Sequence, residues 1–131
     1  MPTIPETHAP ILQTKAVAAL ALVKADGSPQ VTPMWFKHEG DFIIFNTARG
    51  RVKDKILSRM PKVAVAVVDP ENSYRYVQIQ GEVVEGTEEG ANDVIDSLAL
   101  KYLGQPKYPF GQPGEVRVTY KVRIDRVQTM G

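Results

Sequence analysis

The sequence predicts a mainly β fold with some α structure, namely an antiparallel barrel of about six strands with capping helices. Three observations support this prediction. Short runs of β-branched and apolar residues recur along the chain, turn signals separate them at hairpin spacing, and segments with helical periodicity interrupt the series. A curled sheet buries one face, and helices that carry one apolar stripe can cap it.

The first half of the chain favours three successive antiparallel strands. A short helical segment is expected around residues 6–14, followed by the apolar run "AVAALALV". The turn signal "DGSP" at residues 26–29 leads into "QVTPMWF", and "HEGD" at residues 38–41 leads into a strand from Phe42 to Thr47. A short helix is predicted over residues 51–59, because Val52 and Ile56 have helical spacing and Pro61 disfavours its continuation.

The second half adds a hairpin, a helix, a loop and a final strand. "KVAVAVVDP" and "YRYVQIQGEVVEG" pair as one hairpin, and residues 88–103 carry an apolar stripe from Ile95 to Leu103. Three prolines make residues 104–114 a loop around Tyr108 and Phe110. In "EVRVTYKVRIDRV" apolar and polar residues alternate, which predicts a half-buried strand with Arg117 on its polar face.

Length and composition limit the possible functions without choosing among them. Residues 1–131 are expected to form a single domain, since domains commonly contain about 100–150 residues. A net charge of +1 argues against nucleic acid as the main partner. The absence of cysteine excludes disulfides and thiolate chemistry, so redox chemistry would need a bound cofactor. No leader-like or membrane-spanning segment is evident, and a cytoplasmic location without membrane contact is expected.

A cluster of positive charge lies at the start of the predicted helix at residues 51–59. Five basic residues between Arg49 and Arg59 stand against one acidic residue, Asp54. Cations at a helix N-terminus oppose the helix dipole by roughly 0.3–1 kcal/mol each, whereas a bound phosphate would reverse the sign of that effect. Arg51 and Lys53 are therefore candidates for a phosphate site, and a solvated basic surface helix is the alternative.

Two strand segments are candidates for contact with a flat ligand or a second subunit. Pro33 lacks a backbone donor, and Trp35 lies two residues further on the same face, where it is either a ring-binding surface or a core anchor. Another strand face carries only amphipathic and polar side chains, which suits a wet pocket, a subunit interface or an exposed sheet face. These side chains are Tyr74, Tyr76, Gln78 and Gln80.

No catalytic acid, base or metal site is assigned. The histidines, His8 and His38, have no partners at metal-ligand spacing and are expected to be surface or structural residues. Acyl-transfer and phosphate-loop motifs are also absent from the sequence.

Four segments, taken in order, carry a family resemblance: "ADGSPQVTPMWF", "FIIFNTARGRVKDKIL", "MPKVAVAVVDP" and "YVQIQGEVVE". Over roughly residues 17–85, together with the final strand, the chain resembles the pyridoxamine 5'-phosphate oxidase-like split β-barrel proteins, which bind FMN or a deazaflavin. The FMN oxidases usually have an "RxVLLK"-like strand where this chain has "VTPMWF". Within the superfamily the chain is most similar to small oxidoreductases that use coenzyme F420, a deazaflavin with a phosphate and an oligoglutamate tail.

The resemblance implies a homodimer with two cofactors at the subunit interface, each held by residues of both chains. The basic turn and helix start would hold the phosphate, the segment around Pro33 and Trp35 would lie along the ring system, and a third group would come from the strand facing the cofactor. The cofactor-binding residues implied in this way are Pro33, Trp35, Asn46, Thr47, Arg49, Arg51, Lys53, Arg75, Tyr76 and Gln78.

The function that the resemblance implies is deazaflavin-dependent hydride transfer to a planar conjugated small molecule. Two alternatives remain open. One is an FMN-binding pyridoxamine phosphate oxidase-like protein, and the other is a non-catalytic carrier of a flavin or deazaflavin.

Overall fold

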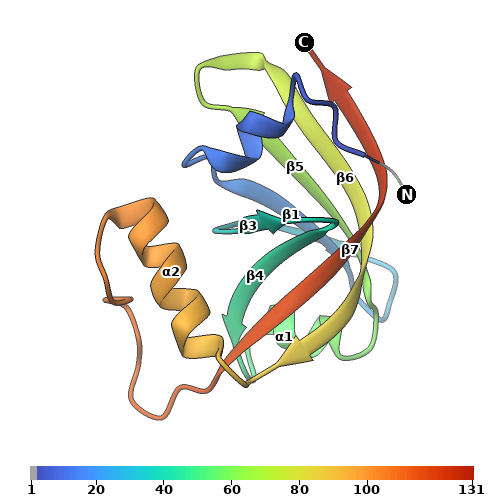
Figure 1. Ribbon diagram of the computed structural model, residues 1–131. Helices are drawn as coiled ribbons and strands as arrows, with labels where there is room; N and C mark the ends of the chain where they lie inside the picture. Colours follow the sequence, from blue (N-terminus) through green and yellow to red (C-terminus); the bar gives the residue numbers. More distant parts are fainter. Residues whose placement is uncertain (1–2) are drawn as a thin grey trace.

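The computed structural model describes residues 3–131, which form one antiparallel sheet of seven strands with short helices around it (Figure 1). The order of the strands across the sheet is β2-β1-β5-β6-β7-β4-β3. The strands are β1 (Ala18–Val23), β2 (Pro29–Met34), β3 (Lys37–Glu39), β4 (Phe42–Ala48), β5 (Lys62–Asp69), β6 (Asn72–Thr87) and β7 (Arg117–Met130). The helices are the 3-10 helix η1 (Ala9–Gln13) and the α-helices α1 (Val52–Leu57) and α2 (Ala91–Leu103).

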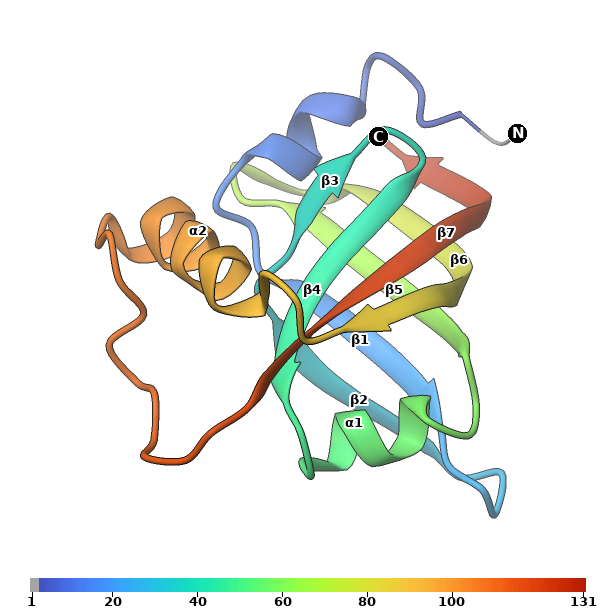
Figure 2. The same ribbon diagram turned by 60° about the horizontal axis from the view of Figure 1, so that its bottom comes forward.

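The sheet curls into a barrel that stays open on one side. Its two edge strands, β2 and β3, are consecutive in the sequence yet lie at opposite ends of the strand order. Figure 2 shows α1 below the sheet near the turn between β1 and β2, while α2 lies outside β4. The predicted class, mainly β with α structure in a split antiparallel barrel, is therefore confirmed.

The number of strands differs from the prediction because the segment before the turn at residues 38–41 is interrupted. β2 ends at Met34, and β3 begins at Lys37 on the other edge of the sheet. At the break, the Phe36 amide donates to the Tyr102 hydroxyl (3.3 Å) and the Phe36 carbonyl accepts from the Lys101 Nζ (2.9 Å). The backbone at this point is thus bonded to side chains of α2 and not to a neighbouring strand.

The helices are also shorter or differently placed than their sequence patterns suggest. The segment at residues 6–14 forms only the 3-10 turn η1, and α1 has six residues in place of the expected nine. α2 lies where it was predicted and buries Ile95, Leu98 and Ala99. Among the described residues, neither α-helix is long and apolar enough to cross a membrane.

The position of α2 changes the burial of β7. The first four residues of β7, from Arg117 to Tyr120, are buried on both faces, because the sheet interior covers one face and α2 covers the other. The expected half-buried pattern is therefore wrong for this start of the strand. The interior itself is filled by large apolar side chains such as Phe36, Phe45 and Leu20, and Leu12 of η1 and Leu57 of α1 close its two ends.

Candidate functional site

A cleft of about 390 Å³ opens between the end of β2, the end of β4, the start of α1 and the inner side of α2. It brings together residues that are distant in the sequence. Six of the ten residues proposed from the sequence line it, namely Pro33, Trp35, Asn46, Thr47, Arg51 and Lys53. Its lining combines aromatic residues with cations, and the Arg117 guanidinium lies over the Tyr108 ring at 5.1 Å from the centroid.

The aromatic wall consists of Trp35 and Tyr108, and Tyr102, which is outside the lining, supports Trp35. The Trp35 ring stacks on Tyr102 of α2, with centroids 5.3 Å apart and an interplanar angle of 5°, and Tyr108 approaches Trp35 edge-on at 6.1 Å. One face of Trp35 is therefore already covered, so this residue anchors α2 and lines the cleft at the same time. Tyr108 brings the loop at residues 104–114 into the lining of the cleft.

Lys53 and Arg51 are two of the cations in this lining. Lys53 is half-buried, and within residues 3–131 it has no ion pair or hydrogen bond through its ammonium group. Burial, and secondarily the charge of Arg51, lowers the pKa of Lys53 below the ordinary lysine value. Arg51 is more exposed and donates from its Nη2 to the Glu115 Oε2 at 3.1 Å. An anion bound between these two cations would relieve their mutual repulsion.

Arg117 is a third cation in this cleft that the sequence did not single out. It is only 7% exposed, and its guanidinium is fixed by two bonds, from Nε to the Asn46 Oδ1 (2.8 Å) and from Nη1 to the Glu115 Oε1 (2.7 Å). In the sequence, Arg117 alternates with apolar residues, and this pattern placed it on the polar, solvent-facing side of the strand. The amphipathic helix at residues 88–103 indicates that some part of the sheet is covered, but no pattern in the sequence identifies Arg117 as the covered residue.

Arg49, in contrast, is directed away from the cleft. Its Nη1 donates to the Asp54 Oδ1 (3.0 Å) and its Nε to the Glu88 Oε2 (2.8 Å). Asp54 is buried and also accepts the Gly50 amide (2.9 Å) and the Tyr120 hydroxyl (2.5 Å). Among the described residues, Arg49 is therefore part of an internal network that holds the turn before α1.

This internal network corrects one step of the sequence argument. Burial raises the pKa of Asp54, but the bonds from Tyr120, Gly50 and Arg49 outweigh burial and leave this pKa below its usual value. Asp54 therefore supplies the negative charge in the first turn of α1. With only six residues and an acid of its own, α1 gives no reason for an external anion at its N-terminus, and the case for one rests on the cations that line the cleft.

The three remaining candidates, Arg75, Tyr76 and Gln78, lie on β6 outside this cleft. The Arg75 Nε pairs with the Asp69 Oδ2 (3.2 Å), and its Nη2 donates to the Thr7 carbonyl (2.6 Å). Gln78 lines a separate hollow between β6 and β7. Within one chain these residues do not join the others, and their contact with a ligand held by a second chain stays a prediction.

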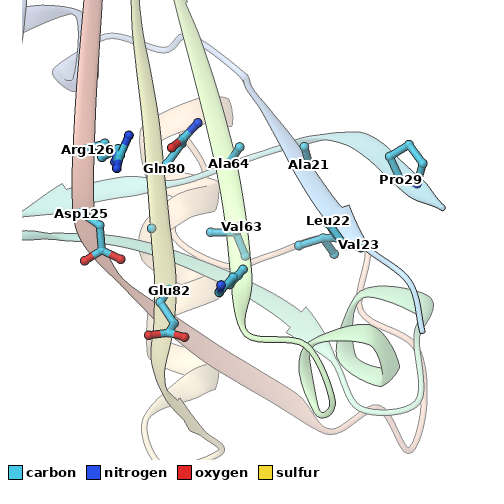
Figure 3. Close-up of a pocket in the computed structure, with 12 residues that line it drawn as sticks. Ala21, Leu22, Val23, Pro29, Val63, Ala64, Gln80, Glu82, Asp125 and Arg126 are labelled. Carbon is cyan, nitrogen blue, oxygen red and sulfur yellow. The ribbon is translucent and has the colours of Figure 1, made fainter. Parts of the chain in front are cut away.

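The outer face of the sheet beside these residues has small side chains. The strand register aligns Gln80, Ala64 and Ala21 across β6, β5 and β1, and next to them Gln78, Ala66 and Ala19 form a parallel row. A hollow of about 440 Å³ lies on this face, and Figure 3 shows Ala21, Ala64 and Gln80 along it together with the charged side chains of β7. The alanine rows leave this part of the outer face without large side chains.

Comparisons with known proteins agree with this architecture. A family model described as pyridoxamine 5'-phosphate oxidase matches residues 4–131. A solved structure described as an F420 reductase is 29% identical, with a TM-score of 0.85, over 95% of this chain and 98% of that chain. A conserved hypothetical protein from Mycobacterium tuberculosis is 23% identical, with a TM-score of 0.77, over 98% of this chain and 85% of that chain. No curated protein sequence is significantly similar to this chain.

A putative pyridoxamine 5'-phosphate oxidase from Listeria innocua has the same fold, with 20% identity and a TM-score of 0.70 over 92% of each chain. The family model covers almost every residue of the chain, including the strands of the open barrel and the residues of the cleft beside β2. This chain belongs to the pyridoxamine 5'-phosphate oxidase family.

Proposed function

We propose that this protein is an oxidoreductase that binds coenzyme F420 in the cleft and transfers hydride to a planar conjugated small molecule. The observation that carries the proposal is Lys53, a half-buried cation without a partner among residues 3–131, in a cleft that is also lined by Trp35 and Tyr108. The likeness to an F420 reductase supports the deazaflavin over FMN. The family match itself supports FMN as the alternative cofactor.

The cleft fits a ligand with a flat ring and a phosphate. Three cations, Arg51, Lys53 and Arg117, face one neighbouring carboxylate, that of Glu115, so the charge balance leaves room for an anion. Pro33 and Trp35 would lie along the ring. The bound cofactor would supply the hydride chemistry, while the side chains of this chain orient the ring and shield it from water. We assign no catalytic acid or base, and a non-catalytic carrier remains the second alternative.

We further propose that the cofactor is shared between two chains of a homodimer. One chain would offer the cleft, and β6 of the other would bring Arg75, Tyr76 and Gln78 to its open side. Pro33 and Gln78 belong to the same cross-strand row of the outer face, through Ala19 and Ala66. Two copies that pack through this face about a two-fold axis parallel to the strands would place β6 of one chain near β2 of the other.

The test is a fluorescence titration of the protein with F420 and, separately, with FMN and riboflavin. We expect Lys53→Ala to weaken binding of the preferred phosphate-bearing cofactor by about tenfold to a hundredfold, as expected for loss of a charge-assisted hydrogen bond. Lys55→Ala is the matched control, because Lys55 is an exposed lysine of the same helix that lies outside the cleft.

Three results would overturn the proposal in different ways. Absence of binding by F420 and FMN alike excludes the cofactor site. Tight FMN binding without any response to F420 replaces the deazaflavin by the flavin. If Lys53→Ala and Lys55→Ala lose cofactor affinity equally, the basic cluster acts only through its overall positive charge and not through a contact of Lys53. Turnover of a conjugated enone with reduced cofactor distinguishes an enzyme from a carrier.

A further inference from the structure

Another space, of about 490 Å³, adjoins the cleft on the side of β2, and we call it the second hollow. It is lined by Gln30, Thr32, Thr47, Gly50, Arg51, Val52 and Lys53. The two spaces share Thr47, Arg51 and Lys53. The lining of the second hollow is otherwise different, because it has no aromatic residue and includes Gln30 and Thr32 of β2. The cationic residues therefore stand at a boundary between an aromatic space and a polar space.

Gln30 and Thr32 occupy positions where an apolar side chain would be expected. In the register of the first hairpin, Thr32 is opposite Leu20 and Gln30 is opposite Leu22, and both leucines are fully buried in the interior. The polar pair thus lies on the inward face of an edge strand, at the open side of the barrel. An apolar pair at these positions would extend the core, so the polar pair needs another explanation.

Both side chains also bury a polar atom without a partner. The Gln30 Oε1 and the Thr32 Oγ1 are inaccessible to solvent and form no hydrogen bond within residues 3–131. Buried polar atoms are nearly always paired, because an unpaired one loses its bonds to water without replacement. Gln30 and Thr32 line the same hollow as Lys53, so two side chains that each carry an unpaired polar atom share this space with a cation that has no partner among the described residues.

We propose that the second hollow is the other half of the ligand site, and that the ligand is a phosphodiester. Its ring lies in the aromatic cleft, its phosphate lies at the boundary formed by Arg51 and Lys53, and its second substituent continues into the polar hollow. There it offers hydrogen-bond donors, such as amide N–H or hydroxyl groups, to Gln30 and Thr32. A phosphate monoester ends at the boundary and leaves both atoms unpaired.

This inference rests on the proposed function and extends it, since it distinguishes ligands by the substituent on the far side of the phosphate. F420 continues beyond its phosphate, whereas FMN ends there. The probes are therefore F420 and its ring fragment without phosphate, together with FMN and riboflavin. The variants are Thr32→Val and Gln30→Met, which remove the polar atom with little change in size, and Thr32→Ser, which retains the hydroxyl.

We expect Thr32→Val and Gln30→Met each to weaken F420 binding by about threefold to tenfold, the usual effect of losing one hydrogen bond. Binding of FMN, of riboflavin and of the F420 ring fragment should stay unchanged, and Thr32→Ser should restore the affinity for F420. Thr129→Val, on the exposed end of β7, is the matched control and should have no effect on any ligand.

Several outcomes would overturn the inference. Equal losses for FMN and F420 would mean that the two side chains act on the phosphate or the fold and do not contact a second substituent. If Thr32→Val or Gln30→Met changes the mass of the assembly relative to the unmodified protein, a second copy of this chain fills the hollow. If F420 binds and Lys53→Ala weakens it while both β2 variants bind it normally, the second half of the site is wrong and the cofactor proposal stands. If neither cofactor binds the unmodified protein, both are wrong.

Discussion

Lys53 and Asp54 are adjacent in the sequence but have opposite surroundings. Asp54 accepts three hydrogen bonds inside the protein, whereas Lys53 faces the cleft without a partner among the described residues. The first turn of α1 therefore directs one charged side chain inward, where it holds the fold, and the preceding one outward, where it can hold a ligand. Variants at the two positions should consequently affect different measurements.

We expect Tyr120→Phe to lower the free energy of unfolding by about 1.5–3 kcal/mol near neutral pH, because it removes a hydrogen bond to the Asp54 carboxylate. Burial, and then the bond to Asp54, raises the pKa of Tyr120 to about 12. The neutral phenol is thus favoured in the folded protein. The resulting stability is complete below the ordinary tyrosine pKa of about 10 and is lost as the pH rises towards 12.

Urea unfolding measured at several pH values tests this prediction. The unmodified protein should lose stability over that alkaline range, and Tyr120→Phe should lack this part of the loss. Tyr74→Phe is the control, since Tyr74 is 78% exposed. If the two variants behave alike, the buried network contributes nothing to stability.

The lowered pKa of Lys53 predicts a pH dependence of cofactor binding. Above neutral pH the phosphate of FMN stays ionised, so a loss of FMN affinity with rising pH that riboflavin does not share reports deprotonation of a protein group beside the phosphate. We expect this loss to begin at a lower pH than an ordinary lysine would give, because burial and then Arg51 depress the pKa of Lys53. Lys53→Arg should keep its charge and move the loss to higher pH.

This prediction is tested by the dissociation constants of FMN and riboflavin, measured on the unmodified protein and on Lys53→Arg. The measurements run from about pH 7 to about pH 10.5, because the ordinary lysine pKa lies near the upper end of this range. The dependence should be specific to FMN. A matching dependence for riboflavin would assign the titration to a group that does not contact phosphate.

At the scale of elements, α2 determines the shape of the cleft. It buries Arg117 on β7, stacks Tyr102 on Trp35 and bonds the backbone at Phe36, where β2 and β3 separate. The Tyr102 hydroxyl also donates to the Ala16 carbonyl at 2.8 Å. One helix thus fixes both the aromatic wall and the break in the strand from which that wall projects.

We expect Tyr102→Phe to destabilise the protein by about 1–3 kcal/mol, because it leaves the Phe36 amide and the Ala16 carbonyl without their partner. The stacked ring is retained in this variant. Since Trp35 is the only tryptophan, its fluorescence reports on the wall directly, and its emission maximum should stay unchanged. Tyr102→Leu should instead shift the emission, and an unshifted spectrum would contradict the stacked arrangement.

Local patterns predicted the elements that depend on neighbours in the sequence. The hairpins around residues 26–29 and 70–71 and the stripe from Ile95 to Ala99 follow from turn chemistry and periodicity. The break at residues 35 and 36 did not follow, because its backbone partners come from α2. The role of Arg117 was missed for the same reason, since the alternation of β7 contains no information about what covers its polar face.

The candidate site was predictable to a similar extent. The cluster of Arg51 and Lys53 stood out by its charge, and both residues line the cleft. Arg49 belongs to the same cluster but is turned away, because Asp54 and Glu88 bind its guanidinium. Charge density in the sequence identifies a basic turn, but only the packed structure determines which of its side chains have internal partners.

At the scale of the whole molecule, the outer face of β1, β5 and β6 is the surface through which we propose that two chains pack. Its alanine rows offer a flat surface, and glutamine and charged side chains border it. We expect the protein to be a dimer through this face, with a mass in light scattering of twice the 14.5 kDa chain at low micromolar concentration.

Ala64→Arg places a long cation at the centre of this face and should convert the dimer to a monomer. Ala25→Arg, in the exposed turn between β1 and β2, introduces the same side chain elsewhere and should leave the dimer intact. If Ala64→Arg stays dimeric, the interface lies on another face. If its monomer binds cofactor with unchanged affinity, the shared-site proposal is wrong.

The strand order also determines when the sheet can form as the chain leaves the ribosome. β1 with β2, and β5 with β6, can pair soon after they emerge, because each pair is a hairpin. β4, however, has only the three-residue β3 beside it until β7 arrives, and β7 is made after β5, β6 and α2. Long-range pairings of this kind slow folding. The cleft, which needs the end of β4 and Arg117 of β7 together, must therefore be among the last parts of the molecule to take shape.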